Sequence, residues 1–406
     1  MNMKTLGGIL LIIGTSIGGG MLALPITAAT SGFGYSSLLL FSFWLLMTFC
    51  AFLILEVNLW LPQNSNIISM AHSTLGKTGS FFAWLCYLLL FYCLLAAYIS
   101  SGSDIIGNFI SKTGWHSPLW LNACLFVLLL GFIVYKGIQS VDYVNRALMF
   151  TKLGAYIALV AVAITYINPQ FLNQNNSQYL ITSVTVMITS YGFATIVPSL
   201  RSYFNDDIKQ LRKVILIGSF IPLICYIIWD LAILGSIPTE GSEGLINMLG
   251  SGHSTTDLPH ALSYYLQNTW ITFFSRIFTS VCVATSFLGV ALGMSDFLAD
   301  GLNISKKGQG NIIIYSTTFI PPLIISVFYP NAFIKGLSLG GIFCAILLVL
   351  YPCLMVWSGR YIKKIGTGYQ VMGGKIALFL VFLSACIIIS IGLLHDLNLL
   401  NLFHLM

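Results

Sequence analysis

Residues 14–25 read GTSIGGGMLALP and lie inside a stretch, 5–55, that contains no Asp, Glu, Lys or Arg. Three consecutive glycines interrupt a run that is otherwise rich in Leu and Ile, and a proline follows shortly afterwards. Glycine and proline weaken a helix, and a membrane tolerates the freed backbone groups only where they line a cavity or meet other protein groups. The stretch therefore predicts a membrane helix that is broken near its middle.

The chain as a whole is poor in charge. Of 406 residues, 18 are Lys or Arg and 12 are Asp or Glu, a charged fraction of 7%, whereas soluble domains carry roughly 25%. Soluble enzymes, nucleic-acid-binding proteins and disordered proteins all need more charge than this. One bilayer crossing takes about 20 apolar residues, and the further stretches without charge cover 78–103, 113–135, 153–200, 277–295, 308–334, 336–359 and 376–395.

Turn-forming residues at 31–34 and 168–169 divide the two longest stretches, and a further apolar segment lies near 214–237. Continuous apolar runs favour helices over barrel strands, which alternate. We therefore expect an all-α polytopic membrane protein, one transporter domain over 1–406, with about eleven transmembrane helices. The expected spans are 5–30, 35–60, 80–110, 119–137, 147–167, 178–200, 214–237, 270–296, 311–328, 337–357 and 376–395.

The positions of Lys and Arg predict the orientation. If the N-terminus is cytoplasmic, fifteen of the 18 cations fall on the cytoplasmic side, and Lys112, Arg276 and Lys335 fall outside. Such an excess is the usual sign of a cytoplasmic face. With an odd number of spans, the C-terminal tail from His395 to Met406 then lies outside.

A second interruption lies in the sixth expected span, where residues 189–198 read TSYGFATIVP. Aligning Pro25 with Pro198 also aligns Gly19 with Gly192, and the offset is five spans. An odd number of spans per repeat inverts the second copy, so we expect a 5+5 inverted-repeat fold with broken helices 1 and 6. The first repeat covers 1–168, the second covers 178–357, and 376–395 is an extra helix. The plainer alternative is that these Gly and Pro residues serve packing and kinks.

A broken helix offers uncharged partners for a charged ligand. N–H groups at the start of the second half-helix suit an anion, and carbonyl groups at the end of the first suit a cation. Both together suit a zwitterion, so the expected substrate class is an amino acid. The candidate binding residues, for which core packing is the alternative, are Thr15, Ser16, Gly18, Gly19, Gly20, Tyr92, Tyr191, Gly192, Phe193, Ser286 and Gly289.

Several ordered motifs resemble those of one family. They are residues 14–25, 189–202, 284–293 with 296–300, 321–330 and 368–374. These stretches resemble the hydroxy and aromatic amino acid permeases of the amino acid/polyamine/organocation superfamily, and most closely the bacterial tyrosine-specific permeases. The resemblance implies a bacterial inner-membrane protein that imports an aromatic amino acid, tyrosine, together with protons. Ala194 departs from the family pattern, because the aromatic branch often carries His at that place.

Ionisable residues at membrane depth are costly and are therefore candidates for coupling or gating. Lys152 resembles the fifth-helix lysine of proton-coupled members of the superfamily, and the alternative is a lysine that snorkels to the inner surface. Glu56 and Asp296 are expected near cytoplasmic ends and Asp104 near the outer side. Each of these three is a gating candidate, with a structural ion pair as the alternative.

Other functions fit the sequence less well. A sodium-coupled permease of the same fold, or one for serine or threonine, is the main alternative. A membrane enzyme needs catalytic or metal-binding residues at membrane depth, but all six His residues fall in loops or the tail without a metal-ligand spacing. We therefore expect no enzyme activity, no metal and no cofactor. A channel is disfavoured because paired broken helices are typical of alternating access.

Overall fold

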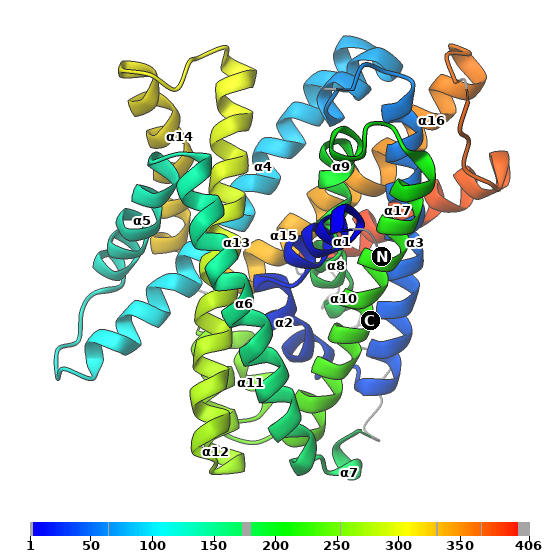
Figure 1. Ribbon diagram of the computed structural model, residues 1–406. Helices are drawn as coiled ribbons and strands as arrows, with labels where there is room; N and C mark the ends of the chain where they lie inside the picture. The colour runs from blue at the N-terminus through cyan, green and yellow to red at the C-terminus, as the bar shows by residue number, and fades with distance from the viewer. Residues whose placement is uncertain are drawn as a thin grey trace.

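The computed structural model (Figure 1) describes residues 3–63, 65–172, 180–251, 253–329, 332–366 and 368–396. These residues form helices and connecting loops, and no strand occurs among them. The α-helices are α1 (Met3–Ser16), α2 (Gly19–Ala28), α3 (Phe33–Leu59), α4 (Ile67–Ser111), α5 (Leu119–Tyr135), α6 (Ile138–Ala163), α7 (Pro169–Leu172), α8 (Leu180–Ser190), α9 (Val197–Phe204), α10 (Ile208–Ser236), α11 (Leu245–Gly250), α12 (Ser254–Leu266), α13 (Thr269–Leu302), α14 (Gln309–Phe328), α15 (Ala332–Ala345), α16 (Tyr351–Trp357) and α17 (Gly374–Asp396). Two short 3₁₀ segments are η1 (Ile164–Tyr166) and η3 (Gly192–Ile196), and two short π-helical segments, η4 (Ile346–Leu350) and η5 (Ser358–Ile362), continue α15 and α16.

The expected membrane spans coincide with helices. Within the described residues, 9 spans are long and apolar enough to cross a membrane, and the bent pair α1–α2 raises this number to 10. α5 is a shorter apolar helix of 17 residues at the place of the fourth expected span. The all-helical, polytopic fold is therefore confirmed. The number eleven and the inverted relation of the two halves stay predictions, and the tail residues 397–406 lie outside the described part of the chain.

Two helices extend beyond the apolar stretches that predicted them. α4 begins at Ile67, where Asn66 and Ser69 cap each other's backbone, and it kinks at Gly76, whose φ is 81°. α6 begins at Ile138, and its first turns carry an exposed ion pair between Asp142 and Arg146. Caps and pairs at i,i+4 stabilise polar helical turns outside a membrane. The charge pattern therefore predicted where these spans lie but underestimated the length of the two helices.

The interrupted helices lie inside the bundle (Figure 1). α1 packs on α10, α2 packs on α8, and α3 packs on α10. On the other side, α4 packs on α15 and α13 packs on α6. The most apolar part of the α8–α9 span is 67% buried, whereas the corresponding parts of α14 and α17 are only 22% and 28% buried. The broken elements are thus surrounded by protein, and α14 and α17 lie at the periphery.

The bundle has two distinct ends (Figure 1). The upper end in the figure holds the links α3–α4, α9–α10, α13–α14 and α16–α17, and we call it the cationic end. Its cations lie in the last two links and in the adjoining ends of α9 and α10: Lys306, Lys307, Lys363, Lys364, Arg201, Lys209, Arg212 and Lys213. The lower end holds α7, α11 and α12, and we call it the loop end. α12 buries Leu258, Ala261 and Leu262 and packs against α13. The connection between α10 and α13 therefore folds onto the bundle as a cover.

Close approach of α15 and α8 generates the first testable prediction. A β-carbon added to Gly341 would lie 2.7 Å from the carbonyl carbon and 2.9 Å from the Cα of Thr185. Since backbone cannot move aside cheaply, Gly341→Ala should lower the free energy of unfolding by about 1–3 kcal/mol. Thermal unfolding of the purified protein in detergent measures this loss.

Gly154→Ala on α6 is the matched control, because its added β-carbon meets no atom within 4 Å. We expect this variant to unfold at the temperature of the unmodified protein. Equal melting temperatures for both variants would contradict the close packing of α15 on α8.

Candidate functional site

The first break separates α1 from α2 at Ile17 and Gly18. The two helices are bent by 53°, and Gly18 adopts extended backbone angles of −155° and −153°. The following glycines allow close contact, since a β-carbon on Gly19 would collide with the ring of Tyr98 and one on Gly20 with Ser190. The three glycines therefore permit both the change of direction and the close packing of the break on α4 and α8.

The carbonyl groups at the end of α1 are held by side chains from two other helices. The Lys152 ammonium on α6 donates to the carbonyl oxygen of Ile17 at 2.5 Å and lies 3.4 Å from Thr285 Oγ1 on α13. Lys152 is only 1% exposed. The Tyr226 hydroxyl on α10 lies 2.7 Å from the carbonyl oxygen of Ser16. These contacts satisfy backbone groups that the helix itself leaves unpaired.

The N–H groups that begin α2 are only partly satisfied. Gly19 N–H donates to Ser286 Oγ on α13 at 2.8 Å. The N–H groups of Gly18 and Gly20 make no hydrogen bond to a described residue. The Ser16 hydroxyl is also buried without a partner. Free N–H groups at the start of a helix are suited to a carboxylate.

The second break is milder than the first. Tyr191 has non-helical angles of −95° and 25°, and the 3₁₀ turn η3 replaces regular helix before α9. The carbonyl oxygen of Ser190, which ends α8, lies 2.8 Å from the Tyr226 hydroxyl. Tyr191 and Phe193 are fully buried, and the Tyr191 hydroxyl has no partner. Tyr226 therefore joins both interrupted helices.

Ala194, where the resemblance leads one to expect His, also lies in η3 and is fully buried. Its methyl group offers no hydrogen bond and no proton at this position. Recognition or coupling in this chain therefore depends on other side chains.

The break is closed on one side and accessible on the other. Gly18, Gly19 and Gly20 are buried, whereas Thr15 and Gly289 are exposed. Gly289 lies three residues beyond Ser286 on α13, so both face the same direction, and a β-carbon at Gly289 would meet nothing within 4 Å. Thr15 precedes the break on α1, and its hydroxyl bonds only to its own helix. Both exposed residues lie toward the cationic end.

The structure gathers most of the expected binding residues but not Tyr92. Its hydroxyl donates to the carbonyl oxygen of Thr317 on α14 at 2.9 Å, away from the break. Tyr98, on the face of α4 that meets Gly19, is the aromatic residue beside the site. Helical rotation separates these two residues, and the uniformly apolar α4 sequence gave no sign of which face points inward. Tyr226 was missed as well, because it lies in no recognisable motif. Thr285 was missed although it lies in the 284–293 motif, because the sequence did not show that it meets Lys152.

The acidic gating candidates all have cationic partners near the bundle ends. Glu56 is fully buried and accepts two hydrogen bonds from Arg360, at 2.6 and 2.5 Å, and a third from the N–H of Val371. Asp296 pairs with Lys306 at the cationic end. These contacts tie α3 and α13 to neighbouring loops.

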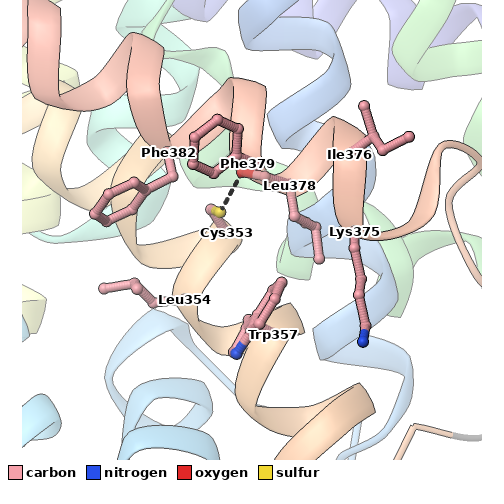
Figure 2. Close-up of a pocket in the computed structure, with 8 residues that line it drawn as sticks. All are labelled: Cys353, Leu354, Trp357, Lys375, Ile376, Leu378, Phe379 and Phe382. Carbon is pink, nitrogen blue, oxygen red and sulfur yellow. Dashed lines mark hydrogen bonds between the residues drawn. The ribbon is translucent and has the colours of Figure 1, made fainter.

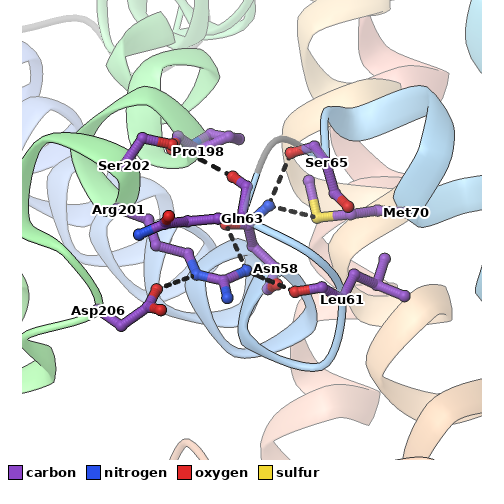
Figure 3. Close-up of polar contacts among 9 residues, drawn as sticks. All are labelled: Asn58, Leu61, Gln63, Ser65, Met70, Pro198, Arg201, Ser202 and Asp206. Atoms are coloured by element: carbon purple, nitrogen blue, oxygen red, sulfur yellow. Dashed lines mark hydrogen bonds and ion pairs between the residues drawn. The ribbon is translucent and has the colours of Figure 1, made fainter.

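Arg201 forms a second clamp at the cationic end (Figure 3). It lies at the end of α9, donates to the carbonyl oxygens of Asn58 and Leu61, and pairs with Asp206 at 2.5 Å. The Asn58 side chain in turn donates to the carbonyl oxygen of Ser65. A guanidinium has enough donors to satisfy several carbonyls at once. The clamp joins the end of the second broken helix to the α3–α4 link, and the sequence did not single it out.

At the loop end, Asp104 on α4 pairs with His253 in the cover. The His253 Nδ1 atom lies 2.8 Å from Asp104 Oδ1. The hydrogen bond to Asp104 and its charge raise the pKa of His253, although partial burial works in the opposite direction. The raised pKa keeps His253 charged to a higher pH than an ordinary histidine, and the charged form strengthens the contact between the cover and α4.

Two cavities lie away from the breaks. The first, about 510 Å³, opens on the outer surface between α16 and α17 and is apolar apart from Lys375 (Figure 2). Its lining suits lipid chains and not a zwitterion, and consists of Cys353, Leu354, Trp357, Lys375, Ile376, Leu378, Phe379 and Phe382. The second, about 440 Å³, lies among α4, α12 and α13 at the loop end. Neither cavity includes a residue of the interrupted helices.

Comparisons with known proteins show which family the chain resembles. Tyrosine-specific transport system 1 of Haemophilus influenzae is 32% identical over 391 residues, which is 96% of both chains. A tryptophan-specific transport protein of Pseudomonas aeruginosa is 30% identical over 386 residues, and glutamine transporter 2 of Aliivibrio fischeri is 30% identical over 392 residues. These cover 93% and 94% of this chain, and 91% and 97% of the respective relatives.

A solved structure shares the fold at low sequence identity. The crystal structure of the Eremococcus coleocola manganese transporter, in complex with an aromatic bis-isothiourea substituted compound, aligns with a TM-score of 0.64. The alignment covers 96% of this chain and 85% of the transporter, with 12% identity. The family model described as the tryptophan/tyrosine permease family matches residues 1–392. This chain therefore belongs to the tryptophan/tyrosine permease family, whose members are transport proteins and not enzymes.

Proposed function

We propose that this protein imports an aromatic amino acid, tyrosine, across the bacterial inner membrane by proton symport with alternating access. The observation that carries the proposal is the first break, where the N–H groups of Gly18 and Gly20 have no described partner and the adjacent carbonyls of Ser16 and Ile17 are held by Tyr226 and Lys152. Two tyrosine-specific relatives are each 32% identical over 96% of the chain. Tryptophan is the second candidate substrate, because tryptophan-specific relatives are 30% identical.

The substrate's two charges would meet the backbone. The carboxylate would accept hydrogen bonds from Gly18 and Gly20 N–H, with the unpartnered Ser16 hydroxyl beside it. The ammonium would bind carbonyl oxygens at the two breaks. Tyr98 supplies aromatic surface next to Gly19, and Gly289 leaves room on α13 for a large side chain. Phe193 is buried in η3, the turn of the second break.

Lys152 is the proposed coupling residue. Its ammonium links α1 to α13 by contacting Ile17 and Thr285, where a sodium ion would need similar oxygen ligands. A resident lysine charge at this position favours proton coupling over the sodium-coupled alternative. Because α1 bends at this contact, the lysine would hold α1 against the fixed helix α13 in one conformation and release it in another.

Orientation follows from the cation distribution, which supports a cytoplasmic N-terminus. The cationic end is then cytoplasmic, and the exposed Thr15 and Gly289 open the site toward the cytoplasm. The cover formed by α11 and α12 lies over the outer side. In this proposal the conformation is inward-facing, with Asp104 and His253 holding the outer cover and the clamps of Glu56 and Arg201 bracing the inner ends.

Transport assays in proteoliposomes test the function. With an imposed inward pH gradient, we expect uptake of labelled tyrosine above that of tryptophan and phenylalanine, and no dependence on sodium. The reason is that no inorganic cation is required where Lys152 already supplies the charge. Uptake that requires sodium would exclude proton symport, and preferred uptake of serine or threonine would exclude the aromatic substrate.

Lys152→Ala should abolish accumulation driven by the proton gradient. One coupled charge at 100 mV supports roughly 50-fold accumulation, and loss of coupling would reduce the ratio to about 1. Lys209→Ala is the matched control, since Lys209 is exposed near the start of α10. Steady-state accumulation in proteoliposomes with equal amounts of inserted protein measures the difference. Unchanged accumulation in Lys152→Ala would assign this lysine a packing role only.

The outer cover should loosen as pH rises. The pKa of His253 is raised by Asp104, so the ion pair is complete below the ordinary histidine value of about 6.5 and is lost as pH passes above the raised value. Hydrogen exchange across residues 245–266, corrected for intrinsic rates, should therefore increase at alkaline pH. His253→Ala should remove this dependence, whereas His260→Ala, which breaks a pair with Glu243 inside the cover, should not. If the hydrogen-exchange protection of residues 245–266 in the unmodified protein does not change with pH, the Asp104–His253 pair does not hold the cover.

A further inference from the structure

Asp230 on α10 differs from the other buried acidic residues described above. Glu56 is paired with Arg360 and Asp104 with His253. Asp230 is fully buried, and the only side-chain hydrogen bond that it receives from a described residue comes from Ser36 Oγ to Oδ2 at 2.6 Å. Its second oxygen, Oδ1, has no partner, and no ion pair joins it to any described residue. Asp230 is therefore a buried carboxyl without a compensating cation.

Among the described residues, no basic side chain forms a hydrogen bond or an ion pair with Asp230. Ser36 faces it from α3, and Tyr191, whose hydroxyl is also unpartnered, interacts with it electrostatically from the second break. On the adjacent position of α10, Trp229 packs on Tyr156 of α6. The helices α2 and α7, which also pack on α10, contain no ionisable side chain. The helices α6, α9 and α12 pack on α10 as well, but their Lys152, Arg201 and His260 bind other groups and form no ion pair with Asp230. The groups facing the carboxyl are thus hydroxyls and aromatic rings.

An ionised carboxylate is costly in such a place. Moving an unpaired charge from water to an apolar interior costs far more than moving a neutral polar group, and one serine hydroxyl does not offset that cost. The uncharged carboxylic acid is therefore the form that fits this conformation. A group that is uncharged when buried, and that ionises when water reaches it, takes up and releases one proton per cycle.

Asp230 is connected to both interrupted helices through its own helix. Tyr226 lies one turn earlier on the same face of α10, and its hydroxyl contacts the carbonyls of Ser16 and Ser190. The rings of Tyr226 and Tyr191 also pack edge to face, with centroids 5.2 Å apart. A shift of α10 caused by charging Asp230 would therefore move the hydroxyl that holds both breaks.

The carboxyl lies toward the loop end. It is six residues before the end of α10 at Ser236, about 9 Å at 1.5 Å per residue. Ser36 is in the first turn of α3, whose start lies at the same end. In the proposed orientation this end is outside, where protons are taken up in a symport cycle.

We propose that Asp230 carries the coupling proton of transport. This inference rests on the proposed proton symport and names the group that the proton occupies. When the site opens to the loop end, an external proton forms an O–H bond with the ionised carboxylate. When water reaches Asp230 from the other side, that O–H bond breaks and the proton enters the cytoplasm, so nothing else is consumed. Lys152 then acts as a fixed charge that braces α1.

Asp230→Asn provides the main test, because an amide keeps the shape and cannot carry the proton. In proteoliposomes we expect the variant to exchange internal for external labelled tyrosine at a rate near that of the unmodified protein. Accumulation driven by a pH gradient should fall at least tenfold, to the equilibrium level. Proton entry accompanying tyrosine, followed with an internal pH dye, should disappear. Asp142→Asn, which alters an exposed acid on α6, is the matched control and should behave as the unmodified protein.

The outcomes separate the two proposals. If the unmodified protein shows neither accumulation by a pH gradient nor proton entry, the proposed symport itself is wrong. If the unmodified protein shows both and Asp230→Asn retains them, symport stands and Asp230 is not the carrier. Asp230→Glu should restore part of the driven accumulation, since it returns a carboxyl to the same place.

Infrared difference spectroscopy gives a test that survives poor folding of Asp230→Asn. Addition of tyrosine to the unmodified protein should change the C=O stretching band of a protonated carboxylic acid. Ser36→Ala removes the hydrogen bond but retains the carboxyl, so it should displace that band. A band that is absent, or that Ser36→Ala leaves in place, would overturn the assignment of the proton to Asp230.

Discussion

The backbone at the break between α1 and α2 must find hydrogen-bond partners where no bulk water is expected. An unsatisfied peptide group costs several kcal/mol in the apolar part of a membrane. The carbonyl oxygens of Ser16 and Ile17 accept hydrogen bonds from Tyr226 and Lys152, and the N–H of Gly19 donates one to Ser286 Oγ. Helices α6, α10 and α13 are therefore positioned around one interrupted turn. Two N–H groups that no described residue satisfies then remain for a ligand.

The few charged side chains near the membrane spans lie at defined positions in the bundle. Glu56 with Arg360 and the Arg201 clamp lie at the cationic end, and Asp104 with His253 lies at the opposite end. Between these ends, the described part of the chain buries Lys152 and Asp230 without an ion pair. Lys152 meets a carbonyl oxygen, and Asp230 meets a serine hydroxyl. A site built mainly from peptide groups can accept a zwitterion without burying additional charged side chains. So apolar a protein can therefore recognise a charged solute.

Much of the fold could be predicted from the sequence because the signals are local. Apolar length predicted where helices cross, and the run of Gly18 to Gly20 predicted the interruption of the first. The face of α4 that lines the site could not be predicted from the sequence. The part of α4 that contains Tyr92 and Tyr98 is apolar on every side, and its rotation depends on the helices that pack against it. The sequence therefore led to Tyr92, whereas the structure places the ring of Tyr98 against Gly19 and the Tyr92 hydroxyl on α14. Tyr226 lies far from both breaks in the chain and reaches them only after α10 packs.

The sequence by itself determined that the protein is a helical membrane transporter, because membrane insertion depends on the apolar length of each segment and helix breaking on the residue types within it. The sequence also identified Lys152 as a charged residue at membrane depth, and this lysine is buried in the structure. Only the tertiary structure decided which groups meet at the interrupted helices, and that Asp230 has Ser36 as its single hydrogen-bond partner. The physical reason is that hydrogen bonds and ion pairs act over a few ångströms, so they depend on the rotation and approach of helices that are distant in the chain.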